Sequence, residues 1–357
     1  MRANVINFHH VLNYGAVFQG YALCEFLNKN GHEAKLIDYR PFYFLSRTYR
    51  PAKGFGKSYR KYKMNRNFLD FRKKHFKLTK EVFLSAKKLT RHYEGSKDAF
   101  ICGSDQVWNA NITNGTIDPG YFLDFVPDSG RKIAYAASIG HTKFNRANKT
   151  EIAKKLRSYS SISVREDFAK QEVLDITDNA VDPFLVLDPT LLLEDYTEVL
   201  DYELVPIEDY MVIYTTENSD SFRDYIRRIY EHLGIKAINL GHYDTGIDSV
   251  DYTNIHPCQW LGLFAKATYV CTNSFHGTAF SIVFNRNFTV LGRETMRDLN
   301  RRQLTLMGGL GLENRFLYNV NDFDVNKHFN DINFVDVKRK LEEQRKSSAK
   351  FLFDALS

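Results

Sequence analysis

Residues 268–284, TYVCTNSFHGTAFSIVF, place one histidine in a polar loop between an apolar run and a helical pattern. The pattern predicts a strand that ends at Thr272 and a helix that is opened by Gly277. Backbone N–H groups and the positive helix end would then attract an anion, which His276 binds when it is protonated. In the alternative interpretation, the neighbouring Asn273 and Ser274 only cap the helix, and His276 hydrogen-bonds to the backbone.

Arg165 follows the strand-like residues 160–164, SSISV, at the expected carboxyl end of a strand. A guanidinium in that place can bind a carboxylate or a phosphate through two parallel hydrogen bonds. It can equally form an ion pair with Glu166, Asp167 or another nearby carboxylate.

A third candidate is the loop of residues 103–109, GSDQVWN, which also follows an apolar strand. Asp105 is placed to take a proton from a hydroxyl group. Trp108 can stack on the face of a sugar whose hydroxyls bind Gln106 and Asn109. The alternative is a polar turn with Trp108 buried in the core.

Asn13, Tyr14 and Gly15 follow the first expected strand and suit either ligand contact or a plain turn with a helix N-cap. They lack the G-x-G-x-x-G spacing of a dinucleotide site. The sequence also contains no HxxxH, CxxC or P-loop spacing, so we expect no metal site and no Walker-type ATP site.

Apolar strand-like runs alternate with helical patterns along the chain, which predicts parallel sheets. We therefore expect an α/β fold in which two Rossmann-like domains face each other across a cleft. The 357 residues are too many for one ordinary core. The first domain is expected to span residues 1–194, the second residues 195–330, and a C-terminal helix residues 331–357.

Composition favours a soluble protein, because 43% of the residues are hydrophobic and 26% are charged. The sequence shows no run typical of a membrane-spanning helix and no signal peptide. The four cysteines lie in apolar runs without CxxC spacing and are expected to be reduced core residues of a cytoplasmic protein.

The net charge of +6 is unevenly distributed, because residues 40–77 hold 13 Lys or Arg and one acid, Asp70. The rest of the chain is acidic. Ten Phe and Tyr are interleaved with these basic residues, a composition suited to phosphates, bases or sugars, or to an anionic membrane surface. The alternative is a helical hairpin with inward aromatic rings and a solvated charged face.

Several blocks, in order, resemble the polysaccharide pyruvyl transferase family. They run from residue 13 to residue 315 and read NYGAVFQGYALCEFLNKNGHEAKLIDY, FICGSDQVWN, IAYAASIG, ISVRE, DPTLLL, TNSFHGTAFSIVFNRNFTVL and LTLMGGLGLENR. The resemblance implies a fold similar to GT-B glycosyltransferases. It also implies transfer of pyruvate from phosphoenolpyruvate, a co-substrate, to two sugar hydroxyls as a ketal. Members serve the assembly of bacterial capsular, exopolysaccharide or cell-wall glycans.

The family pattern assigns phosphoenolpyruvate binding to Arg165 and His276, with Arg302 as a weaker candidate. In this scheme the second domain faces the donor and also uses Asn273, Ser274 and Gly277. The first domain faces the acceptor through the candidates Asn13, Tyr14, Gly15, Gln106, Trp108 and Asn109.

In the same scheme, His276 donates or shuttles the proton, Asp105 is the candidate base, and neither a metal nor another cofactor is required. The acceptor is a sugar or a lipid-linked glycan, and the basic insert brings the cytoplasmic enzyme to the inner membrane face. Two alternatives are a GT-B-type glycosyltransferase that uses a nucleotide sugar and, less favoured, a nucleic-acid binder that works through the insert.

Overall fold

The computed structural model describes residues 1–50, 54–140, 142–217, 219–294 and 297–357. The chain forms two compact units, the first made of Met1–Pro51, Arg72–Leu193 and Glu343–Ser357 and the second of Ala52–Phe71 and Glu194–Glu342. The division after Leu193 lies beside the boundary expected at residue 194. The middle of the basic insert, however, belongs to the second unit, and the C-terminal helix α13 (Phe334–Leu356) is divided between both.

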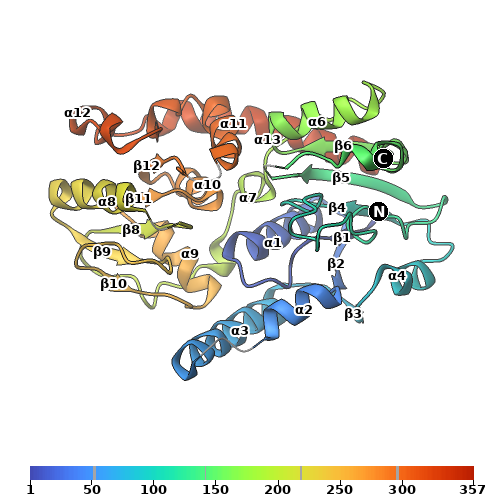
Figure 1. Ribbon diagram of the computed structural model, residues 1–357, viewed down its shortest axis with the longest axis horizontal. Coiled ribbons are helices and arrows are strands. Elements are labelled where there is room, and N and C mark those ends of the chain that lie inside the picture. Colours follow the sequence, from blue (N-terminus) through green and yellow to red (C-terminus); the bar gives the residue numbers. More distant parts are fainter. Residues whose placement is uncertain (51–53, 141, 218, 295–296) are drawn as a thin grey trace. The chain divides into compact units, whose positions relative to one another are not determined.

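The sheet of the first unit has seven strands in the described part of the chain, in the order β3-β2-β1-β4-β5-β6-β7 (Figure 1). Every neighbouring pair is parallel, as the alternating pattern predicts. The strands are β1 (Arg2–Ile6), β2 (Glu33–Tyr39), β3 (Leu78–Phe83), β4 (Ala99–Cys102), β5 (Arg131–Ala137), β6 (Ser161–Val164) and β7 (Phe184–Leu185). The strand order reverses between β1 and β4, and ligands of such sheets bind at the carboxyl ends beside this switch point.

The helices of this unit are α1 (Tyr14–Lys29), α2 (Phe42–Tyr49), α4 (Ala86–His92), α5 (Lys149–Arg157), α6 (Asp167–Thr177) and α7 (Pro189–Leu192). Helix α1 begins where Asn13 accepts a hydrogen bond of 3.0 Å from the amide of Ala16. It is buried along most of its length, which fits its dense run of apolar and small residues.

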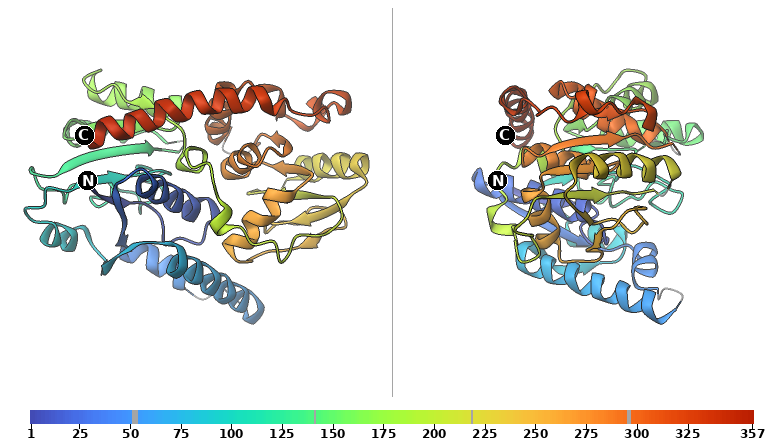
Figure 2. Two further views of the ribbon diagram at one scale, coloured as in Figure 1. Left: turned by 180° about the vertical axis from the view of Figure 1, so that it is seen from behind. Right: turned by 90° about the vertical axis from the view of Figure 1, so that its left-hand side faces the viewer.

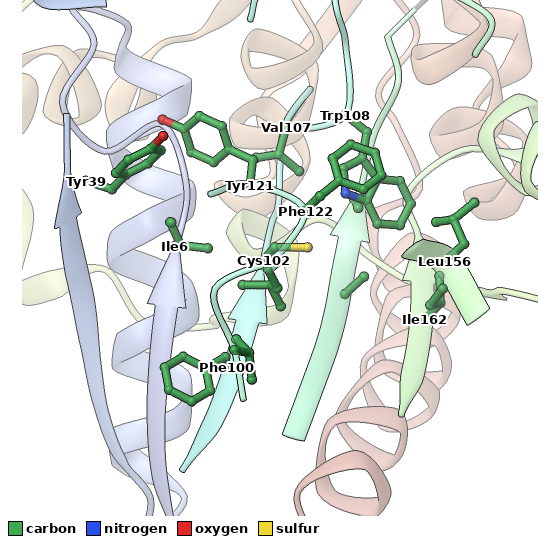
Figure 3. Packing of buried hydrophobic residues seen from close by; sticks show 14 of the residues in the cluster. Ile6, Tyr39, Phe100, Cys102, Val107, Trp108, Tyr121, Phe122, Leu156 and Ile162 are labelled. Atoms are coloured by element: carbon green, nitrogen blue, oxygen red, sulfur yellow. The ribbon is translucent and has the colours of Figure 1, made fainter. Parts of the chain in front are cut away.

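Aromatic residues dominate the core of the first unit. Phe100 of β4 and Trp108 of the following loop belong to one buried cluster with Tyr121 and Phe122 (Figure 3). The Trp108 indole is stacked on the Phe122 ring, with 5.4 Å between ring centroids. This cluster fixes the loop that follows β4.

The second unit has its own parallel sheet, which contains six strands among the described residues in the order β10-β9-β8-β11-β12-β13. The strands are β8 (Tyr210–Tyr214), β9 (Lys236–Asn239), β10 (Val250–Asp251), β11 (Tyr269–Thr272), β12 (Asn287–Leu291) and β13 (Phe316–Leu317). The helices are α8 (Asp220–Leu233), α9 (Pro257–Lys266), α10 (Phe275–Val283), α11 (Asn300–Leu310) and α12 (Val325–His328). Here the switch point lies between β8 and β11.

The basic insert of residues 40–77 forms α2 and the long helix α3 (Phe55–His75), while its residues 51–53 lie outside the described part. Within the second unit, Asn67 of α3 donates a 2.9 Å hydrogen bond to the carbonyl of Asn254. Helix α3 is drawn in blue and α13 in red in Figure 2. No helix of the described residues is long and apolar enough to span a membrane.

Candidate functional site

The loop between β11 and α10 has the strand–loop–helix geometry that the sequence predicts. The strand ends at Thr272, but the helix begins at Phe275, two residues before Gly277. A Cβ atom on Gly277 would lie 2.3 Å from Oγ1 of Thr272. The glycine therefore permits close helix–strand packing, which corrects the expectation that it opens the helix.

Asn273 lies at the switch point of the second sheet and its side chain has a fixed orientation. Its Oδ1 accepts hydrogen bonds from the amide and the hydroxyl of Thr216, at 2.8 and 2.9 Å. The residue is 1% exposed, and its Nδ2 has no hydrogen-bond partner among the described residues. A buried amide donor of this kind carries a desolvation cost that a ligand acceptor would remove.

Ser274 is the N-cap residue of α10, and in the described structure its side chain makes no capping hydrogen bond. The positive end of this nine-residue helix is therefore not neutralised by its own cap. His276 lies in the first turn and is buried, with its ring edge-on to Phe275 at 5.2 Å. The guanidinium carbon of Arg302 lies 5.9 Å from the centroid of the same Phe275 ring.

The sequence interpretation missed Arg293, which follows β12 at the same carboxyl edge of the sheet. Its Nη2 donates a hydrogen bond to the hydroxyl of Thr216, and burial lowers the pKa of the guanidinium. The structure thus connects Asn273, Thr216 and Arg293 through hydrogen bonds. The signal in the sequence was a cation directly after the expected strand NFTVLG.

Arg165 of the first unit is surrounded by carboxylates. Its Nη1 donates to Oδ2 of Asp188 at 2.6 Å, its Nε lies 3.4 Å from Oε2 of Glu166, and its Nη2 lies 3.8 Å from Oδ1 of Asp105. Burial alone would lower its pKa, but these three carboxylates raise it above the usual arginine value. Donor binding by Arg165 stays a prediction, since its charge already holds three acids together.

Asp105 is half-buried in the loop after β4, where its backbone has a positive φ of 71°. The neighbouring Ser104 hydroxyl donates a 3.0 Å hydrogen bond to Oδ2 of Asp188. The loop therefore contacts the ion-pair network twice, through Ser104 and through Asp105. Asp105 therefore has a fixed place at the carboxyl edge of the first sheet. Its role as a base stays a prediction.

The other candidates of this loop divide into a polar pair and a core residue. Asn109 donates a 2.7 Å hydrogen bond to Oε1 of Gln106, so the two amides hold each other. Trp108 is 2% exposed and is packed by Phe122 and Tyr159. We assign Trp108 to the core, which corrects the expectation that it stacks on a sugar.

Residues 13–15 serve the start of α1. Asn13 is exposed and caps the helix, whereas Tyr14 and Gly15 are buried. The plain N-cap interpretation accounts for what the structure shows of Asn13. Acceptor binding by these three residues stays a prediction.

A buried histidine pair, His9 and His10, in the segment between β1 and α1 was also missed. Nε2 of His9 lies 3.2 Å from Oδ1 of Asp38. The same oxygen also accepts a hydrogen bond of 2.5 Å from Nε of Arg40. Burial alone would raise the pKa of Asp38, but its bonds from His9 and Arg40 lower it to about 2. Neither ring nitrogen of His10 has a partner in the described residues, and burial lowers its pKa well below the usual value.

The described residues contain no group of three or more His, Cys, Asp or Glu that could hold a metal ion. In the described structure the four cysteines are buried and form no disulfide, and burial raises the pKa of Cys24 and of Cys102 to about 12.

A family model described as polysaccharide pyruvyl transferase matches residues 13–295. Among solved structures, the chain is similar to the Methanocaldococcus jannaschii UDP-GlcNAc 2-epimerase in complex with UDP-GlcNAc and UDP. The identity is 13%, the TM-score is 0.50, and 97% of this chain and 94% of that chain are covered. It is also similar to S. aureus MnaA with UDP, at 11% identity and a TM-score of 0.50, over 100% and 90% of the two chains. No curated protein matches. The two parallel sheets and these likenesses are those of a GT-B-like fold.

Proposed function

We propose that this chain, which belongs to the polysaccharide pyruvyl transferase family and is therefore a transferase, uses phosphoenolpyruvate as its donor. The observation that carries the proposal is the first turn of α10 in the second unit. There the N-terminus of α10 and the buried amide of Asn273 adjoin His276, and the cation Arg302 lies over the Phe275 ring, which His276 also contacts. A ligand with a carboxylate and a phosphate suits such donors and positive charges.

The proposed reaction forms two C–O bonds at C2 of the donor and breaks one. A proton is added to the methylene carbon, which becomes a methyl group, and the first sugar hydroxyl attacks C2. The second hydroxyl then displaces phosphate and closes the cyclic ketal. Of the two hydroxyl protons, one balances the proton taken up by the methyl group and the other leaves with phosphate.

His276 is proposed to donate or pass the proton to the methylene carbon, and Asp105 to accept one from a hydroxyl. The role of Asp105 is supported by its half-buried place at the carboxyl edge of the first sheet, where its Oδ1 lies 3.8 Å from Nη2 of Arg165. Ser274, the N-cap residue of α10, and Gly277 in its first turn are proposed to serve the donor through their backbone. No step of this scheme needs a metal or another cofactor.

The proposed acceptor is a sugar or a lipid-linked glycan of bacterial capsule or exopolysaccharide assembly, held by the first unit. The polar pair Gln106 and Asn109 and the loop of residues 13–15 carry this proposal. The polar pair follows β4 and the loop follows β1, and the sheet has its switch point between the carboxyl ends of these two strands.

A membrane contact is proposed for α3, at the inner face of the cytoplasmic membrane. Phe55, Tyr59 and Tyr62 share one face of this helix and are 91%, 61% and 63% exposed. The basic side chains around them are Lys57, Arg60, Lys61, Lys63 and Arg66. Each Lys or Arg near an anionic leaflet contributes about 1 kcal/mol, and exposed aromatic rings suit the membrane interface.

The donor is tested by calorimetry with phosphoenolpyruvate and, separately, with a nucleotide sugar. We expect phosphoenolpyruvate to bind and to compete with inorganic phosphate, while the nucleotide sugar binds weakly or not at all. Binding of the nucleotide sugar alone would instead support a glycosyltransferase of the GT-B type, whose diphosphate also suits a helix N-terminus.

A further inference from the structure

We infer that Arg293, together with Asn273, binds the phosphate group of the donor and that Thr216 positions both side chains. This inference rests on the proposed function and deepens it, because it names the residues that hold a phosphomonoester. Arg293 lies at the carboxyl end of β12 and Thr216 after β8, so both belong to the same edge of the second sheet as the start of α10.

The backbone of Arg293 is held in place by one residue of α11. Its amide donates to Oδ1 of Asn300 at 2.9 Å, and its carbonyl accepts from Nδ2 of the same side chain at 3.2 Å. Such a reciprocal pair fixes the direction in which the arginine side chain leaves the sheet. The guanidinium is then held at its tip, because Nη2 donates to the hydroxyl of Thr216.

The positive charge of Arg293 is half-buried without an ion pair to any described carboxylate. Burial lowers its pKa, while Glu217 is the acid that acts against this effect, with smaller contributions from the hydroxyls of Tyr243 and Tyr214. A guanidinium carries five N–H donors, of which the contact with Thr216 uses one. A desolvated cation in this state is stabilised strongly by an anion that accepts several hydrogen bonds.

Asn273 supplies the second, independent observation. The amide and hydroxyl of Thr216 both donate to its Oδ1, which fixes the amide orientation and leaves Nδ2 as a buried donor. The unused groups contributed by Asn273 and Arg293 are therefore N–H donors. A phosphate offers only acceptor oxygens and negative charge, so it complements this set better than a sugar hydroxyl does.

Thr216 connects the side chains of Asn273 and Arg293 through its one hydroxyl group. That oxygen accepts from Arg293 and donates to Oδ1 of Asn273 at 2.9 Å. A valine at this position keeps the shape and the backbone amide but removes the hydroxyl. It should therefore loosen Arg293 while leaving the fold in place.

The test measures binding of inorganic phosphate and of phosphoenolpyruvate by calorimetry, with the thermal unfolding of each variant recorded beside it. Arg293→Gln should weaken the binding of both anions about 10- to 100-fold, the range for loss of a charge-assisted hydrogen bond. Arg293→Lys should lose less affinity, because it keeps the charge but not the planar fork. Thr216→Val should weaken the binding of phosphate, and Thr216→Ser, which restores the hydroxyl, should bind phosphate as the wild type does.

The matched control is Arg228→Gln on α8 of the same unit, whose guanidinium is exposed and paired with Asp224 at 3.0 Å. It should bind both anions as the wild type does. Wild-type affinity for phosphate in Arg293→Gln would overturn the inference and leave the proposed donor intact. A wild type that binds neither anion would overturn both. If Arg293→Gln does not fold, unchanged binding by Arg293→Lys together with Thr216→Val is the contradicting result.

Discussion

Replacing Arg165 with methionine tests what the buried guanidinium does. Methionine keeps an unbranched apolar stem but removes the charge that lies 2.6 Å from Asp188 and 3.4 Å from Glu166. The arginine side chain is 2% exposed and these two carboxylates are fully buried, so water cannot replace the lost partner. We expect Arg165→Met to be strongly destabilising rather than neutral.

The magnitude follows from the burial of the ion pair. Removing one partner of a buried pair costs about 3–5 kcal/mol of unfolding free energy. For a unit of this size, that corresponds to a drop of roughly 6–20 °C in the midpoint of thermal unfolding. Asp188→Asn removes one of the uncompensated charges and still accepts the hydrogen bond from the amide of Thr190, which lies 3.0 Å from Oδ1. The double variant should therefore lose about 1–3 kcal/mol less than the sum of the single losses.

The assay is urea unfolding of the wild type, both single variants and the double variant, with calorimetric binding of phosphoenolpyruvate to every variant that folds. Stability within about 1 kcal/mol of the wild type, with loss of phosphoenolpyruvate binding, would refute this reasoning. It would show that Arg165 serves the donor and contributes little to holding the acids. Large destabilisation with retained binding would assign Arg165 to structure alone.

Three further predictions follow from other parts of the chain. Gly103→Ala should be strongly destabilising in urea unfolding, because its Cβ would lie 2.2 Å from the carbonyl oxygen of Tyr135 at a φ of 113°. Gly115 also has a positive φ but has open space around it, so Gly115→Ala should lose much less free energy of unfolding in the same titration. Burial keeps the pKa of His10 well below its usual value, so the unfolded chain takes up a proton below about pH 6.5 that the native state does not, and stability falls as the pH decreases. His10→Asn should flatten that fall by up to about 1.4 kcal/mol per pH unit in unfolding titrations between about pH 7 and pH 5, and an unchanged slope would contradict it. The chain should sediment with anionic but not neutral vesicles at low salt, and the binding should be lost when four basic residues become Glu, namely Lys57, Arg60, Lys61 and Lys63; no sedimentation with anionic vesicles would rule the membrane contact out.

The alternation of apolar runs and helical patterns was sufficient to predict two parallel sheets, because buried parallel strands are nearly continuous apolar runs. Strand β3 escaped prediction because it is a largely exposed edge strand that follows the charged insert. The exchange of residues 52–71 into the second unit also escaped, since a contact such as that of Asn67 with Asn254 joins residues far apart in the sequence.

For the site, residue type and position after a strand located the α10 loop, but they could not distinguish ligand contact from packing. Gly277 and Trp108 illustrate this, because the Thr272 hydroxyl and the facing Phe122 ring decide their roles, and the sequence does not show that these groups lie in contact with them. Arg293 was missed for the same reason. Its importance comes from contact with Thr216, which follows another strand, β8.

Phosphoenolpyruvate-dependent transfer to a glycan is tested most directly by following the product. The protein is incubated in deuterated water with phosphoenolpyruvate and candidate lipid-linked or nitrophenyl glycosides, and mass spectrometry follows the glycan while a colorimetric assay follows phosphate. We expect one added pyruvyl ketal with one deuterium in its methyl group for each phosphate released, and loss of both signals in His276→Ala. Transfer of a sugar from a nucleotide sugar, with no pyruvyl product from phosphoenolpyruvate on any of these acceptors, would contradict this expectation.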